Sequence, residues 1–159
     1  MDVFSHALWG PTIVRKRKLL ALALAFGMLP DLVGATVTYT MDAIFHVPIE
    51  RIPSFFINLY YSTHSLLAII ILFIILLLFF RKYLILTLPY LFHLILDLPT
   101  HAGVYANRPF YPFSSFAFEG IRWEDNWWTI ALSAMGLLII NLIFYLMKKW
   151  PNIQNQSKT

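Results

Sequence analysis

The sequence predicts an all-α protein, namely a polytopic membrane helix bundle with about four transmembrane helices and an N-terminal half-helix. Of its 159 residues, 59% are hydrophobic, and the mean hydropathy is +0.68, more than a soluble core of this length requires. Only 13% of the residues are charged. We expect a single transmembrane domain over residues 1–150, followed by a disordered tail at 151–159 that is rich in Asn, Gln, Ser and Lys.

The first apolar segment, residues 3–14, is too short to cross a bilayer alone. A helix of about 10 residues spans about 15 Å, half of the hydrocarbon core. We therefore expect a half-helix that packs among the longer helices.

Four longer apolar segments are predicted to cross the membrane. They are residues 19–39, 57–80, 83–98 and 127–147. Paired Tyr and Trp residues near their ends are typical of membrane interfaces. The connections at 40–56 and 99–126 contain several prolines and many aromatic residues, which predicts ordered outer loops lying on the membrane.

Prolines interrupt two of these segments. Pro30 lacks the N–H donor that a helix interior needs, so we expect the first long helix to end near Leu29. Pro89 is expected to bend the third span. Pro99 is expected to end it, because the residue before a proline is steered away from helical backbone angles.

Three short basic runs predict the orientation of the chain. They are residues 15–18, 81–82 and 148–149. Positive residues favour the cytoplasmic side, and placing the first run there puts all three runs on that side. We therefore expect a multi-pass plasma (inner) membrane protein with cytoplasmic N- and C-terminal basic segments. This charge pattern argues against nucleic-acid binding, and the sequence does not define an oligomeric state.

Five ionisable residues lie within the apolar segments, where desolvation makes such residues rare and marks them as functional candidates. They are His6, Asp31, His64, His93 and Asp97. Counted from the basic runs, the last four lie about 16–25 Å along their helices, in the outer half of the bilayer. Their shared depth on three different spans predicts one polar cluster.

The types and spacing of these residues favour a metal site. His93 and Asp97 are four residues apart, so one helix face presents both to a single ion. His101 follows four residues later, on the loop beyond Pro99, and is a further candidate ligand. The chain has no cysteine, so imidazole and carboxylate are the remaining ligands, which suit Zn²⁺ and also Mn²⁺. Taken singly, each His could instead be an interhelical hydrogen-bonding residue, and Asp31 a helix cap.

Several motifs, in this order, carry a resemblance to a known family. They are Ser5-His6-Ala7-Leu8, Gly27-Met28-Leu29-Pro30-Asp31, Thr63-His64-Ser65 and His93-Leu94-Ile95-Leu96-Asp97-Leu98-Pro99-Thr100, followed by Gly103 and Tyr111-Pro112-Phe113. Residues 5 to 113 resemble the predicted membrane-bound metal-dependent hydrolases, the family that includes a LexA-regulated bacterial inner-membrane protein.

A more distant resemblance connects the chain with the zinc-dependent phospholipase C and P1 nuclease group. It implies one zinc ion held by Asp31, His64, His93 and Asp97. It implies a second ion held by His6, the N-terminal region and a bridging Asp97. The third zinc of that group requires a His-x-x-x-Glu helix, which this sequence lacks, so one or two ions are expected.

The residues and the resemblance together predict a membrane-bound, zinc-dependent hydrolase that acts on a lipid, first of all on a phosphoester in the manner of a phospholipase or lipid phosphatase. Bound zinc activates water for attack, and Asp31 or Asp97 would accept the proton of that water. Arg108 and Arg122, in the second outer loop, are candidates for binding the substrate phosphate.

Two alternatives stay open. A zinc-dependent acyl or amide lipid hydrolase would use the same chemistry. A non-catalytic membrane protein, either a metal transporter or a scaffold with a structural metal site, would use the same ligands without a reaction. A serine mechanism is disfavoured because the sequence has no Gly-x-Ser-x-Gly motif.

Overall fold

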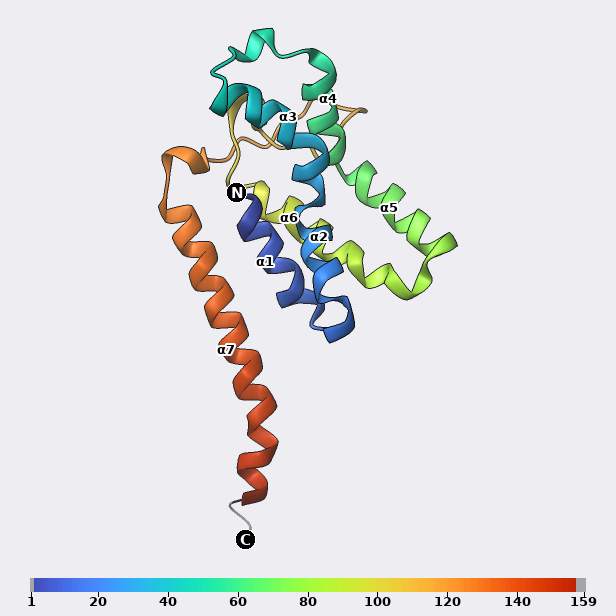
Figure 1. Ribbon diagram of the computed structural model, residues 1–159, viewed down its shortest axis with the longest axis vertical. Coiled ribbons are helices and arrows are strands. Elements are labelled where there is room, and N and C mark those ends of the chain that lie inside the picture. The colour runs from blue at the N-terminus through green and yellow to red at the C-terminus, as the bar shows by residue number, and fades with distance from the viewer. Residues whose placement is uncertain (1, 157–159) are drawn as a thin grey trace.

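The computed structural model describes residues 2–156 and confirms the predicted class, an all-α polytopic helix bundle (Figure 1). The helices are α1 (Val3–Val14), α2 (Leu20–Pro30), α3 (Thr36–Tyr39), α4 (Ser54–Thr63), α5 (Leu66–Phe79), α6 (Thr87–Asp97) and α7 (Trp128–Gln156). Short 3-10 turns lie at Arg17–Leu19, Ile49–Arg51, Arg81–Leu86, Gly103–Tyr105 and Trp123–Asp125, and π-helical turns at Asp31–Ala35 and Thr40–Ile44. The described residues form no β-strand.

The first long helix continues through Pro30. The two π-helical turns join α2 to α3 and extend the helical stretch to Ile44, so the prediction that this helix ends near Leu29 is wrong. Proline removes only its own N–H and already has a helical φ, and the wider π turn that follows accommodates the missing bond. The first of the two predicted outer loops is correspondingly shorter than 40–56, because this connection begins after Ile44 and ends before Ser54.

The predicted second span, 57–80, is two helices, α4 and α5, whose axes differ by 62°. Ser65 between them has extended backbone, and its Oγ accepts a hydrogen bond of 3.3 Å from the N–H of Ala68. This bond caps the N-terminus of α5 and fixes the break. The polar run Ser62-Thr63-His64-Ser65 coincides with this break, but the apolar residues on both sides of it were predicted as one span.

Two helical stretches are long and apolar enough to cross a membrane, Arg17–Asp42 and Trp128–Lys148, and the bent pair α4 and α5 makes a third if it acts as one span. The predicted third span, 83–98, contains only part of a 3-10 turn and the 11-residue α6. A helix of that length measures about 16 Å, half of the hydrocarbon core. By length and composition, two or three helical stretches could each cross the membrane alone, while the segment between α5 and the second loop returns through the 3-10 turn and the shorter α6.

Helix α7 lies at one side of the bundle and runs beyond it (Figure 1). It contacts α1 through a hydrogen bond of 2.9 Å from Trp9 Nε1 to Ser133 Oγ and one of 3.2 Å from Asn141 Nδ2 to Thr12 Oγ1. Residues 151–156, expected to be disordered, have helical backbone, because a helix can pass a proline by losing one hydrogen bond. Residues 157–159 of the predicted tail lie outside the described residues.

The helices that carry the polar cluster approach closely at glycines. A Cβ atom at Gly10 would collide with the carbonyl oxygen of Ala23, and one at Gly27 with the carbonyl oxygen of His6. Such contacts of small residues are typical of helix packing in membranes. They hold α1 against α2, and α6 packs against both. His6, near the start of α1, is thereby brought beside the end of α2.

Candidate metal centre

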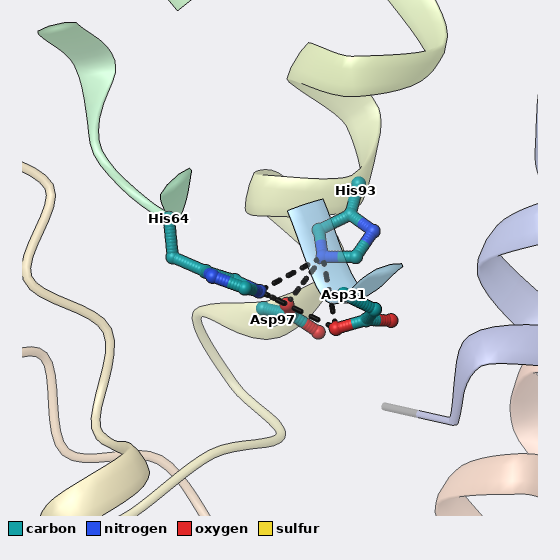
Figure 2. A group of neighbouring side chains, drawn as sticks. All are labelled: Asp31, His64, His93 and Asp97. Atoms are coloured by element: carbon teal, nitrogen blue, oxygen red, sulfur yellow. Dashed lines mark hydrogen bonds and ion pairs between the residues drawn. The ribbon is translucent and has the colours of Figure 1, made fainter. Parts of the chain in front are cut away.

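Four side chains from three segments of the chain meet where helices end or break (Figure 2). Asp31 begins the π turn after α2, His64 lies at the break between α4 and α5, and His93 and Asp97 lie on the last turns of α6. One ligand atom from each residue lies within 4.8 Å of the others. The structure thus brings together the four residues on which the sequence argument rests.

The distances within this group are short. His93 Nε2 lies 3.0 Å from Asp97 Oδ2 and 3.7 Å from Asp31 Oδ1. His64 Nε2 lies 3.7 Å and 3.4 Å from the same two oxygen atoms, respectively. The side chain of Asp97 is fully buried, whereas that of Asp31 is 14% exposed. Asp31 is therefore the member of the group whose side chain can be reached from outside the cluster.

Backbone carbonyl groups orient both imidazole rings. His93 Nδ1 lies 2.8 Å from the carbonyl oxygen of Gly27, and His64 Nδ1 lies 2.9 Å from that of Tyr60. A carbonyl oxygen can only accept, so each Nδ1 carries a proton and donates it. Each Nε2 atom then faces the centre of the group, which is how second-shell hydrogen bonds hold metal-binding histidines.

This arrangement fits a divalent ion. The Nε2 atoms of His64 and His93 lie 3.2 Å apart, and in neutral rings both present lone pairs towards two carboxylates. Such groups repel one another unless a cation or a proton lies between them. Asp31 Oδ2 is buried and has no hydrogen-bond partner. Two imidazole nitrogens and two carboxylates form a ligand set that suits Zn²⁺ and also Mn²⁺.

Asp97 also contacts a second pair of histidines. Its Oδ1 lies 2.8 Å from His6 Nε2 and 3.3 Å from His101 Nδ1. The His6 ring stacks on His93 with centroids 3.7 Å apart, and His6 Nδ1 is buried without a hydrogen-bond partner. Asp97 therefore lies between two imidazole pairs, one on each oxygen, as a carboxylate that bridges two ions would.

The two predicted phosphate ligands lie elsewhere. The Arg108 guanidinium lies 4.1 Å from the centre of the Tyr61 ring, and Arg122 pairs with Asp125 at 3.5 Å on the exposed surface. Neither residue lines the cavity of about 420 Å³ that adjoins Asp31 and His101. Binding of phosphate by Arg108 or Arg122 stays a prediction.

Sequence reasoning did not assign roles to Gly27 and Tyr60. Both act through backbone carbonyl oxygens, which every residue possesses, so their types carried no signal. The Tyr60 ring also stacks on His64 at a centroid distance of 4.2 Å. A small residue such as Gly27 indicates close helix packing at most, and it does not identify the side chain that its carbonyl oxygen meets.

Fold and site together define a polytopic helical membrane protein with a buried His–Asp cluster that can hold a divalent ion. The sequence model of the YdjM inner membrane protein family matches residues 1–154, and this chain belongs to that family. Family membership confirms the inner-membrane setting and the resemblance to this type of bacterial protein. Searches of curated proteins and of solved structures found no match. The likeness to zinc-dependent phospholipase C and P1 nuclease stays a prediction.

Proposed function

We propose that this chain is a membrane-bound, zinc-dependent hydrolase that cleaves a phosphoester bond of a membrane lipid. The observation that carries the proposal is the convergence of His64, His93 and two carboxylates at one buried point beside a cavity. A purely structural site would be closed by its ligands, whereas this one has an accessible side at Asp31. When bound, Zn²⁺ supplies a Lewis acid that makes water nucleophilic at neutral pH and polarises the attacked group.

The two carboxylates have different roles in this proposal. Asp97 is fully buried between four imidazoles and acts as the holding and bridging ligand. Asp31 lines the cavity, and its Oδ2 has no hydrogen-bond partner. Asp31 therefore accepts the proton as water oxygen attacks phosphorus, and the proton passes to the leaving oxygen when the phosphorus–oxygen bond breaks.

A phosphoester is favoured by the position of Asp97 between two imidazole pairs. Two ions, held by His64 and His93 on one side of Asp97 and by His6 and His101 on the other, would suit an in-line displacement, because they would supply positive charge near both the attacking and the leaving oxygen. Cleavage of an acyl or amide bond is the second candidate. It is favoured because the described residues that line the cavity include no Lys or Arg.

We also propose the orientation that the basic runs predict. The turn between α1 and α2 and the turn between α5 and α6 lie on the same side of the bundle, towards the end to which α7 runs (Figure 1). These turns and the end of α7 contain the three basic runs. With that side cytoplasmic, the cluster lies in the outer half of the bilayer.

The experiment compares the wild-type protein with Asp31→Asn in native lipid mixtures supplied with Zn²⁺. Loss of the proton acceptor should reduce product formation about a hundredfold or more, read by mass spectrometry of the lipids. Asp125→Asn, which changes an exposed loop carboxylate, should retain the wild-type rate. A zinc-loaded wild-type protein that releases no headgroup, phosphate or acyl chain would instead favour the transporter or scaffold alternative.

A further inference from the structure

The cavity beside the cluster is enclosed by α1, the helical stretch from Met28 to Thr40, α4 and the second outer loop. It is lined by Asp2, Val3, Phe4, Met28, Asp31, Leu32, Ala35, Thr36, Tyr39, Thr40, Tyr60, His101 and Trp123. Its volume is about 420 Å³, which is within the usual range for small-molecule sites. Two members of the polar cluster, Asp31 and His101, form part of its wall.

One side of this cavity reaches the surface that the protein presents to lipid. Phe4 and Leu32 line the cavity and are 77% and 49% exposed. Large apolar side chains with this exposure face hydrocarbon in a membrane protein. At the other extreme, Ala35 and Tyr60 line the same cavity and are 6% and 1% exposed. The cavity thus connects the hydrocarbon phase with the buried interior beside Asp31.

Several polar groups of the wall are already paired, while Trp123 Nε1 is a buried donor without a partner among the described residues. Thr36 Oγ1 and Thr40 Oγ1 donate to carbonyl oxygens of their own helix, at 3.0 Å and 2.6 Å. Asp2 accepts hydrogen bonds from the N–H and the hydroxyl of Ser5. Among the described residues, the lining includes two carboxylates and no Lys or Arg. An apolar chain matches this wall, and a second negative charge on the ligand would be repelled.

We propose that this cavity binds the hydrocarbon chain of the lipid substrate, which enters sideways from the bilayer between Phe4 and Leu32 and places the bond to be cleaved at Asp31. The proposal rests on the hydrolase function above and specifies its substrate. The substrate is a lipid with a long alkyl or acyl chain, whose head carries no anionic group beyond the bond that is attacked.

Photo-crosslinking tests this directly. The full chain, loaded with Zn²⁺, is placed in lipid nanodiscs that contain a phosphatidylethanolamine with a diazirine near the end of one acyl chain. After illumination, mass spectrometry locates the labelled residues. Lipids around the protein label its exposed surface, whereas Ala35 and Tyr60 are buried and are labelled only by a chain inside the cavity.

A matched pair of variants provides the control. Thr36→Phe adds bulk at an exposed position that lines the cavity, and Val37→Phe adds similar bulk at the next position, which is 38% exposed and does not line it. Thr36→Phe should reduce labelling of Ala35 and Tyr60 about tenfold, because the added atoms displace the chain. Val37→Phe should leave it unchanged. No label at either buried residue, or equal labelling in both variants, would overturn the proposal.

The head group is tested with a phosphatidylserine probe that carries the same acyl chain and has one carboxylate more than the ethanolamine head. Phosphatidylethanolamine should label Tyr60 and Ala35 more strongly than phosphatidylserine, and equal labelling would contradict the assigned head group. Labelling requires no turnover. Cavity labelling without hydrolysis would therefore reject the hydrolase function alone, and hydrolysis without cavity labelling would reject the present inference alone.

Discussion

Asp97 is the residue around which the candidate site is organised. Its side chain is fully buried, and its two oxygens contact imidazoles that come from α1, the α4–α5 break, α6 and the second outer loop. A buried carboxylate is costly unless cations or hydrogen bonds compensate its charge. Asp97 is therefore the residue that contacts most of the candidate ligands, and its burial carries a large desolvation cost that bound cations or hydrogen bonds must offset.

His6→Ala tests whether a second ion is bound. His6 contacts Asp97 Oδ1, whereas His64 and His93 contact Oδ2. The variant should retain the ion at His64 and His93 and lose the second, as measured by metal analysis of the purified protein. His46→Ala, in the first outer loop, is the control and should retain the wild-type content. Equal metal content in both variants would contradict a second ion at His6.

For the individual residues, the sequence predicted which side chains form the cluster, but not how their imidazole rings are oriented. Ionisable residues in apolar segments are conspicuous, and the four-residue spacing of His93 and Asp97 indicated a shared helix face. The carbonyl group of Gly27 reaches His93 from another helix, which depends on tertiary packing, whereas that of Tyr60 lies one turn before His64 in α4. Neither contact depends on the type of residue that supplies the carbonyl oxygen.

The helices position these residues by close packing and by irregular turns. Gly27 shows this best, because its missing side chain lets α1 approach and its carbonyl oxygen holds His93. The π turn at Asp31 and the break at His64 place two further ligands at points where regular helix is interrupted. Local deviations from helical geometry are often found at functional sites.

Gly27→Ala tests this packing. The added Cβ meets the backbone oxygen of His6, which cannot move aside like a flexible side chain. We expect a loss of about 1–3 kcal/mol in unfolding free energy and weaker metal binding, measured by thermal unfolding with and without Zn²⁺. Gly136→Ala is the matched control, since its added Cβ meets only the Trp9 ring. A melting temperature equal to that of the control would argue against the close α1–α2 contact.

Composition and periodicity predicted the helical class correctly, but they misplaced the helix boundaries. Pro30 was expected to end a helix that in fact continues, and Ser65 caps a helix start within a segment that was predicted as one span. Both errors have the same cause. A proline or a serine is compatible both with a continuing helix and with a helix end. Packing against neighbouring helices decides between these two conformations.

For the whole molecule, the prediction is that the three basic runs, residues 15–18, 81–82 and 148–149, lie on the cytoplasmic side. The chain has no cysteine, so single cysteines can be introduced as reporters. In spheroplasts, a membrane-impermeant maleimide should label Glu50→Cys and Ser115→Cys, and it should label Lys82→Cys only after lysis. These three positions are exposed in the structure. The opposite pattern would invert the proposed orientation.

Metal analysis of the purified protein tests the central claim most directly, because every step of the proposed chemistry depends on an ion at Asp31, His64, His93 and Asp97. The wild-type protein should contain bound zinc or manganese. Alanine at His93 or Asp97 should remove this metal, while Asp125→Ala should retain it. A wild-type protein free of divalent metal, in which a protonated imidazole compensates the carboxylates, would contradict the account, and so would unchanged metal content in the His93 and Asp97 variants.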